Sequence, residues 1–248
     1  MYGLMDYYEP DIQLTEEEIS GAGHSGPPMT ATAATRGLFT ELLREARRLA
    51  RAKAVCKALP VAKATGRQLF LEGGQVLTSS LLARLAGPAE SLLVAVLTLG
   101  EAIDRRVEEY NKSGLAAHAY FLDVAGSYLI DAAGRRLTEE IRAHLKGRGL
   151  EATIPLGPGH SYWKNLQDQK VIYSLADPSK IGVRILDSGM MLPKKTLSMV
   201  MGIGRGLPPS KNNHCHYCDL GQKCPLSRAK TPDLKNFFAA PENFPEKE

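Results

Sequence analysis

The fold of this chain is decided by the stretch SLLVAVLTL, residues Ser91–Leu99, which ends at Gly100. Its apolar residues follow one another without the alternation of a half-buried strand, and some are β-branched. An apolar run of this length that ends at a glycine is typical of a strand buried on both faces. We therefore expect a central strand here, with other elements covering both sides of its sheet.

Helical and extended patterns alternate on both sides of this strand. Before it, the spacing predicts a helix over 38–58 that Pro60 stops, a strand over 68–72 and a helix over 79–85. After it, the patterns predict helices over 101–110, 116–145 and 166–175 and strands over 152–156, 181–186 and 196–203. Because local and crossing connections are mixed, the pattern favours an α+β fold over a doubly wound sheet.

The composition is that of an ordinary globular protein and excludes several classes. Hydrophobic residues make up 44% and charged residues 23% of the 248 residues, and the formal net charge is only +4. So small an excess of positive charge argues against a nucleic-acid partner. The longest apolar run, Leu92–Leu99, is far too short to cross a bilayer, so we expect no membrane partner.

The cysteines indicate the compartment. There are four, and three of them lie within ten residues of one another, which is unlike a secreted disulfide scaffold. The first twelve residues carry acidic side chains and no signal pattern. We therefore expect a reducing, cytoplasmic location in which clustered thiols stay available for a metal.

Both ends of the chain differ in composition from the middle. Residues 1–37 read as an N-terminal helical extension and linker, with a capped helix start at Thr15 and a Gly/Pro/Ser/Thr/Ala-rich stretch from Gly21 to Thr35. Residues 38–206 carry the α+β pattern. Residues 207–248 form a cysteine-cluster tail.

The strongest chemical motif lies in that tail. It reads His214-Cys215-His216-Tyr217-Cys218 and continues to Cys224-Pro225. A Cys-x-x-Cys turn lets two thiolates converge on one ion, and a third thiolate on the following loop closes a face of the site. We expect a metal site on Cys215, Cys218 and Cys224.

The identity of the metal stays open from spacing alone. An iron–sulfur cluster, a structural zinc knuckle and unligated thiols all fit the motif. The fourth ligand could be His214 or His216, which would suit zinc, or Cys56, which would give four thiolates. A four-iron cluster with an open fourth position also fits.

A second candidate site is the loop Gly157-Pro158-Gly159-His160-Ser161-Tyr162-Trp163. Pro158 and Gly159 before a polar–aromatic run indicate backbone that approaches a ligand closely, because glycine leaves room. The alternative is a tight turn in which Trp163 is only a packing residue. No catalytic residue can be assigned, since the six histidines are isolated from any recognisable nucleophile motif.

Several segments together give the chain a resemblance to a known family. They are QLFLEGGQVLTSSLLARL (68–85), LLVAVLTLGEAIDRRVEEY (92–110), the helix 121–140, Pro158-Gly159 with Gln169 and Ile172 behind it, and IGVRILDSGMMLPKKTLSMVMGI (181–203). In this order and spacing the chain resembles the activation domain of cobalamin-dependent methionine synthase, in the stand-alone form associated with corrinoid methyltransferases. The resemblance covers roughly residues 12–205 and ends before the cysteine cluster.

The resemblance implies a fold and an activity. The fold implied is a curved, mainly antiparallel sheet flanked by helices. The family domain binds S-adenosylmethionine and presents it to an inactive cob(II)alamin, a reductant supplies one electron, and the methyl group re-forms methylcobalamin. The implied partner is a corrinoid protein or cobalamin-dependent methyltransferase, which carries the corrinoid itself.

The same resemblance implies the ligand-binding residues. They are Pro158, Gly159, His160, Asp123, Ser188 and Met191. The chain departs from the family's Arg-x-x-x-Gly-Tyr loop, because Pro155 stands in place of the arginine and His160 in place of the tyrosine. An arginine would hold a carboxylate bidentately, which proline cannot do.

Two functional hypotheses follow. The first is a reactivation factor that supports reductive remethylation of a corrinoid, with an iron–sulfur cluster at Cys215, Cys218 and Cys224, His214 beside them, and S-adenosylmethionine as methyl donor. The second is a non-catalytic module that binds a corrinoid protein and carries a structural zinc site.

Overall fold

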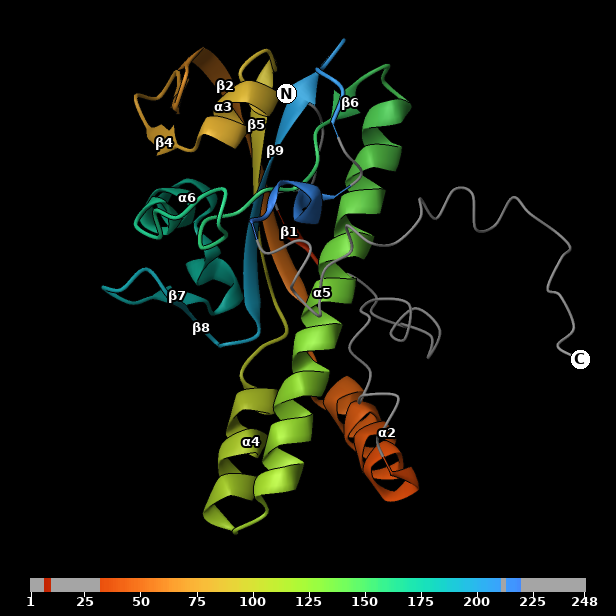
Figure 1. The fold of residues 1–248 in the computed structure, drawn as a ribbon. Helices are drawn as coiled ribbons and strands as arrows, with labels where there is room; N and C mark the ends of the chain where they lie inside the picture. Colours follow the sequence, from red (N-terminus) through yellow and green to blue (C-terminus); the bar gives the residue numbers. More distant parts are fainter. Residues whose placement is uncertain (1–6, 10–31, 211–212, 220–248) are drawn as a thin grey trace, which may run out of the picture.

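The protein is described here by a computed structural model, which places residues 7–9, 32–210 and 213–219 (Figure 1). Its strands are β1 (Tyr7–Tyr8), β2 (Lys53–Thr65), β3 (Gln68–Leu71), β4 (Val76–Thr78), β5 (Ser91–Thr98), β6 (Glu151–Ala152), β7 (Arg184–Ile185), β8 (Met191–Leu192) and β9 (Thr196–Gly204). Its helices are α2 (Ala33–Leu49), α3 (Ser80–Ala86), α4 (Ala102–Lys112), α5 (Ala116–Lys146) and α6 (Asp168–Ala176), with 3-10 turns η1 (Pro178–Ile181) and η2 (His214–Tyr217).

One antiparallel sheet organises the molecule. Its strand order is β4-β3-β2-β5-β9-β6, and β1 pairs with β2. Every pairing in the sheet is antiparallel, so the predicted α+β class with a curved antiparallel sheet is confirmed. A separate hairpin, β7–β8, lies beside α6 (Figure 1).

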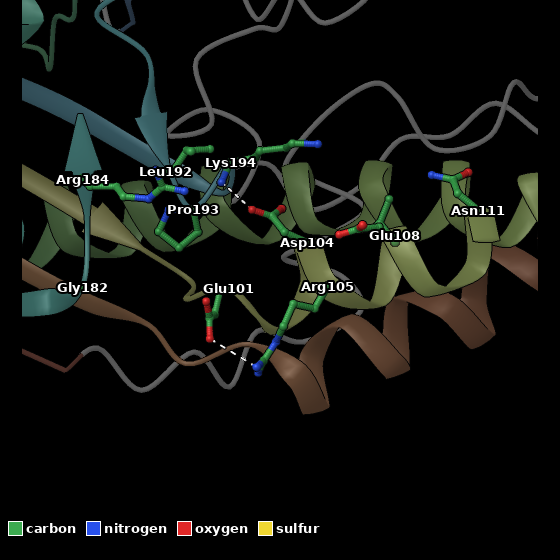
Figure 2. Close-up of a pocket in the computed structure, with 11 residues that line it drawn as sticks. Glu101, Asp104, Arg105, Glu108, Asn111, Gly182, Arg184, Leu192, Pro193 and Lys194 are labelled. Atoms are coloured by element: carbon green, nitrogen blue, oxygen red, sulfur yellow. Dashed lines mark hydrogen bonds and ion pairs between the residues drawn. The ribbon is translucent and has the colours of Figure 1, made fainter. Parts of the chain in front are cut away.

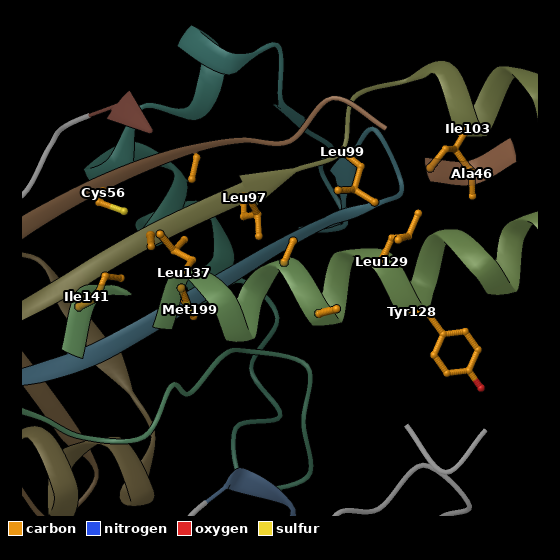
Figure 3. Close-up of a cluster of buried hydrophobic side chains, with 14 of the residues drawn as sticks. Ala46, Cys56, Leu97, Leu99, Ile103, Tyr128, Leu129, Leu137, Ile141 and Met199 are labelled. Atoms are coloured by element: carbon orange, nitrogen blue, oxygen red, sulfur yellow. The ribbon is translucent and has the colours of Figure 1, made fainter. Parts of the chain in front are cut away.

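Strand β5 occupies the middle of the sheet and is buried along its whole length. Leu93, Ala95 and Leu97 point into the core beneath α2, α4 and α5. Leu92, Val94 and Val96 point into the core beneath α3 and α6. The predicted central strand with both faces covered is therefore confirmed, and Figure 3 shows the α5 side of this packing.

Helix α5 packs closely on the sheet through its glycines. A Cβ added at Gly134 would lie 2.8 Å from Cδ2 of Leu197, and one added at Gly126 would lie 2.9 Å from Cε of Lys195. Glycine inside a helix costs stability, so its presence here reflects the short distance to β9. Helix α5 therefore lies close to the residues at the start of β9 at both positions.

The prediction of one helix over 38–58 is wrong in its second half. Helix α2 ends at Leu49, and β2 begins at Lys53. Strand β2 pairs with β5 up to Pro60 and with β3 from Val61 onward. The register of the β2–β3 pairing shifts between Val61 and Lys63. Pro60 therefore lies where β2 changes partner, just before this irregularity, and a residue without an N–H is tolerated there. The alanines and lysines of 50–58 carry no local strand signal, and pairing with β5 overrides their helical spacing.

Other boundaries are shorter or longer than expected. The predicted strand 152–156 shares only Ala152 with β6, the predicted strand 181–186 is reduced to β7, and β1, β4 and β8 were not predicted. Helix α2 begins at Ala33, where the Thr32 hydroxyl accepts a hydrogen bond from the Thr35 N–H. The predicted helix start at Thr15 lies outside the described residues. Within the described part of the chain, no helix is long and apolar enough to cross a membrane.

Gly202 offers a test of the packing between β9 and α3. A Cβ added there would lie 2.9 Å from both Cα and Cβ of Ala86, and the backbone that carries these atoms cannot move aside cheaply. We expect Gly202→Ala to lower the free energy of unfolding by about 1–3 kcal/mol in urea denaturation. Gly37→Ala is the control, because Gly37 is exposed in α2 with nothing within 4 Å, and it should be neutral or stabilising. Equal stability of the two variants would contradict this packing.

Candidate functional site

The loop Gly157–Trp163 forms a compact turn at the edge of β9. The preceding residue Leu156 exchanges both backbone hydrogen bonds with Val200, at 3.0 and 2.8 Å. The Gly159 N–H donates to the Trp163 carbonyl (2.9 Å), and the Trp163 N–H donates to the His160 carbonyl (2.8 Å). Gly159 has a φ of +93°, which favours glycine. The loop is therefore held by its own backbone, with Gly159 and His160 exposed.

Asp168 fixes the far end of this loop. It is only 6% exposed. Its Oδ2 accepts hydrogen bonds from the Trp163 indole N–H (2.8 Å) and the Thr78 backbone N–H (2.7 Å), and its Oδ1 accepts one from the Asn165 amide (2.9 Å). The Ser79 hydroxyl adds a bond to the Tyr162 carbonyl (3.2 Å). The loop is thereby fastened to the junction of β4 and α3.

The structure brings the two sequence-predicted sites together. The segment Asn213–Asp219, which contains Cys215 and Cys218, lies against the loop. The Ser161 hydroxyl donates to the Cys218 sulfur (3.4 Å) and accepts from the Asp219 N–H (2.8 Å). The loop and the cysteine segment, about fifty residues apart in the sequence, thus form one composite surface.

Aromatic and imidazole rings fill the contact between the loop and the cysteine segment. The His160 ring stacks on Tyr162, with centroids 5.1 Å apart and an angle of 9° between the planes. The His214 ring lies 4.9 Å from His160 and 6.1 Å from Tyr162. On the other side of η2, the Arg84 guanidinium lies 5.5 Å from the centre of the Tyr217 ring, within the range of a cation–π contact.

Burial in this contact shifts two pKa values. His160 is exposed as a residue, but its ring packs against Tyr162 and His214, and the resulting desolvation disfavours the imidazolium and lowers the pKa of His160 from its ordinary value. Burial also raises the pKa of Tyr162 strongly, and the nearby Cys215 and Cys218 raise it further, although a hydrogen bond from Gly157 opposes the shift. At neutral pH the loop therefore presents a neutral imidazole, able to donate and accept one hydrogen bond each, and a neutral phenol.

The predicted residues Ser188 and Met191 lie on the β7–β8 hairpin, which meets the loop through a shared neighbour. A Cβ added at Gly189 would lie 2.7 Å from the Leu166 carbonyl oxygen, and one added at Gly159 would lie 3.5 Å from Leu166 Cδ1. Met191 Sδ lies 3.9 Å from the amide nitrogen of buried Gln169. Pro158, Gly159, His160, Ser188 and Met191 therefore belong to one side of the molecule.

Asp123 lies elsewhere. Its Oδ1 accepts a hydrogen bond from the ammonium group of Lys195 (2.8 Å), which also donates to the Ser127 hydroxyl (3.0 Å). The Lys195 side chain is only 7% exposed, so Asp123 compensates a nearly buried charge. Asp123 is on α5, which packs on the sheet face opposite to Trp163 and α6. The structure does not bring it to His160.

The predicted metal donors are only partly within the described residues. Cys215 and Cys218 share one turn, in which the Cys218 N–H donates to the Cys215 carbonyl (3.2 Å) and the Asn213 side chain accepts from the Cys215 N–H (3.0 Å). Two thiols and an imidazole on one turn suit a thiolate-bound metal chemically. Among residues 7–9, 32–210 and 213–219, however, no group of three or more His, Cys, Asp or Glu side chains is arranged to hold a metal. Cys224 lies outside them.

Cys56 is excluded as a further ligand. It is 6% exposed and belongs to the core under α5 (Figure 3). Tyr217, between Cys215 and Cys218, packs against the core on the other face of the sheet. The sheet therefore separates Cys56 from the cysteine segment.

A separate groove of about 370 Å³ lies between α4 and the β7–β8 hairpin (Figure 2). Its α4 wall carries carboxylates and its hairpin wall carries Arg184 and Lys194. Asp104 Oδ2 accepts a hydrogen bond from the Lys194 backbone N–H (2.6 Å), and Glu101 pairs with Arg105 (3.3 Å). The groove is of mixed charge and includes none of the loop or cysteine-segment residues.

Sequence reasoning missed Asp168, and it did not predict the contacts of Lys195 or of Ser161, which it had placed in the candidate loop. Asp168 stands in the first turn of α6, and an acidic residue at that place is an ordinary helix-start signal that does not reveal its bond to Trp163. Ser161 and Lys195 act through partners 58 and 72 residues away, which leave no local pattern.

Removal of the Asp168 carboxylate should loosen the whole loop. We expect Asp168→Ala to lower the free energy of unfolding by about 2–4 kcal/mol, because it leaves buried donors without acceptors. Trp163 is the only tryptophan and is buried, so its fluorescence should shift to the red as the loosened loop exposes the indole to water. Asp168→Asn keeps an acceptor and should lose less. An unchanged emission spectrum in Asp168→Ala would contradict the assignment.

Comparisons with known proteins agree with this fold. No protein-family model matches the chain, and no curated protein matches it. Among solved structures, the crystal structure of the MetH reactivation domain bound to AdoHcy (S-adenosylhomocysteine) matches with a TM-score of 0.61 and 14% sequence identity. The match covers 83% of this chain and 79% of that one. The resemblance first seen in the sequence is therefore confirmed at the level of the fold: this chain has the fold of a methionine synthase reactivation domain.

Proposed function

We propose that this chain is an accessory factor that reactivates a corrinoid protein by reductive remethylation, in the reducing environment of the cytoplasm. The observation that carries the proposal is the contact between the loop Gly157–Trp163 and the Cys-x-x-Cys segment on a reactivation-domain fold. Such a reaction needs a methyl donor and an electron in the same place. The loop would bind the methyl donor. The cysteines would bind the metal centre that delivers the electron.

The proposed reaction transfers one electron and one methyl group to the corrinoid of the partner. A corrinoid of the partner in the Co(II) state accepts one electron and becomes Co(I). Co(I) attacks the methyl carbon of S-adenosylmethionine, the sulfur–carbon bond breaks, and S-adenosylhomocysteine leaves as a neutral thioether while methylcobalamin forms. AdoHcy, the ligand of the structural neighbour, is the product of such a transfer.

The residues of this chain that would hold the methyl donor are those around the loop. Gly159 leaves room for close approach, and neutral His160 offers one donor and one acceptor. Ser188 and Met191 would line the hairpin side. Because residue 155 is proline, no arginine at that position can bind the carboxylate of S-adenosylmethionine. This carboxylate would depend on single hydrogen bonds such as those of His160. Asp123, which binds Lys195, would act only as a support of the fold.

Cys215, Cys218 and Cys224 would hold the metal, with His214 as the neighbouring imidazole. We propose an iron–sulfur cluster, which when bound supplies one electron at low potential. Zinc is the alternative, and with it the chain would be a non-catalytic module that binds a corrinoid protein. The missing arginine at Pro155 is the observation that favours this second function.

Metal analysis distinguishes the two functions. We expect protein purified without oxygen to be brown and to contain iron and sulfide, and Cys218→Ala to lose most of both. Cys56→Ala is the control, because that thiol lies on the other face of the sheet and should leave the metal content unchanged. Colourless wild-type protein with stoichiometric zinc would reject the electron-transfer role and support the binding module.

Calorimetric titration tests the methyl-donor site. We expect S-adenosylhomocysteine to bind saturably to the wild type and roughly fivefold more weakly to His160→Ala, the factor for one lost hydrogen bond. His144→Ala, at an exposed position near the end of α5, is the matched control and should bind like the wild type. If the wild type shows no saturable binding, the loop is not a site for this ligand.

A further inference from the structure

The Cys-x-x-Cys motif forms one tight turn at the end of η2. The Cys218 N–H donates to the Cys215 carbonyl (3.2 Å), and the Cys215 N–H donates to the side chain of Asn213, which caps η2 (3.0 Å). In a 3-10 turn the side chains of residues i and i+3 lie one above the other. The two cysteine side chains therefore leave the turn on the same side.

This common side faces the loop Gly157–Trp163. The Ser161 hydroxyl donates to the Cys218 sulfur (3.4 Å), which places that sulfur against the loop. Burial raises the pKa of Tyr162, and both cysteines raise it further, so both thiols lie within electrostatic range of this one phenol. The Cys215 and Cys218 sulfurs are thus neighbours of the same ring.

The backbone of the turn already suits a disulfide. A turn closed by a hydrogen bond between residues i and i+3 keeps their Cα atoms less than about 7 Å apart. The Cα atoms of a disulfide are usually about 4.4–6.8 Å apart. A bond between the Cys215 and Cys218 sulfurs therefore needs rotation of the side chains and little movement of the backbone.

The two thiols are also accessible, unlike that of Cys56. Cys215 and Cys218 are free and partly exposed, whereas Cys56 is only 6% exposed in the core under α5. Thiol–disulfide exchange requires access of the attacking thiolate to the other disulfide, and buried structural thiols are inert. A disulfide in solution can therefore reach the Cys215–Cys218 turn and not Cys56.

We propose that Cys215 and Cys218 are a reversible redox pair, which small disulfides of the glutathione type convert to an intramolecular disulfide. The thiolate of one cysteine attacks a sulfur of the small disulfide, and one small thiol leaves. The thiolate of the other cysteine attacks the resulting mixed disulfide, and the second small thiol leaves. Two cysteine thiols are oxidised, one small disulfide is reduced to two thiols, and the two cysteine protons pass to these leaving groups.

This pair goes beyond the proposed function and needs neither a metal nor a methyl donor. A disulfide uses both sulfurs, so the oxidised chain could not bind a metal through Cys215 and Cys218. If the proposed function is correct, oxidation would therefore switch off the metal site, and a reducing cytoplasm would keep the thiols available.

Oxidation of the full-length, metal-free protein with oxidised glutathione tests the pair. We expect two of the four cysteine thiols to be lost and Cys56 to stay reduced. Cleavage after Lys211 and Lys223 places Cys215 and Cys218 in one peptide without Cys224, and this peptide should be lighter by two hydrogens. Cys218→Ser is the matched control and should keep this peptide free of an internal bridge.

Three results would overturn the redox pair. They are thiols that all stay reduced, glutathione adducts in place of the internal bridge, and a bridge that joins Cys224 to either cysteine of the turn.

The geometry of the turn has its own test. We expect Asn213→Ala to lower the equilibrium constant for bridge formation in glutathione buffers about fivefold, the factor for one lost hydrogen bond at the start of η2. Asn111→Ala, at an exposed position of α4, is the matched control and should behave like the wild type. Equal constants for Asn213→Ala and the wild type would overturn the turn as the cause of the pairing.

Discussion

Burial of β5 on both faces is the constraint on which the rest of the structure depends. Leu92, Leu93 and Leu97 are 0% exposed, and burial of each such side chain contributes roughly 1.5–3 kcal/mol. Covering both faces requires helices on each side of the sheet, and α5 on one side and α3 with α6 on the other meet that need. The segment that connects the two sides passes from β6 along β9 and becomes the loop Gly157–Trp163. The position of the candidate site therefore follows from the packing of one strand.

The sequence could predict those helices and strands whose pattern lies within the element itself. Strand β5 and helix α5 were predicted because each carries its own pattern, an unbroken apolar run in one and a long helical period with glycines in the other. Strand β2 was missed because its register is set by β5, up to forty-five residues away (Lys53 pairs with Thr98), and its alanines and lysines continue the spacing of α2. Pro60 read as a helix stop, and only the pairing reveals it as the point where the strand changes partner.

The candidate site was predictable in its parts and not in its assembly. The Cys-x-x-Cys motif and the Pro158-Gly159 turn each have a chemical signature in a few consecutive residues. Ser161, His160 and His214 make the contact between the two parts, and no local pattern in the sequence indicates that these three residues meet. Asp123, which the family resemblance assigned to ligand binding, accepts a hydrogen bond from the nearly buried Lys195, a contact that no local pattern in the sequence indicates.

The two halves of the composite surface are held with unequal strength, and this difference has a mechanical consequence. Asp168 and Ser79 fasten the loop to the β4–α3 junction through buried hydrogen bonds, which are costly to break. The described contacts of the cysteine segment with the loop are the tilted ring contacts of His214 and the two bonds of Ser161, at a partly exposed surface. When the two parts move relative to each other, the segment therefore moves against a fixed loop. In the reaction that we propose, a large partner would bring its corrinoid to the methyl group, and a rigid loop beside an adjustable cysteine segment would let the loop set the geometry of the methyl transfer.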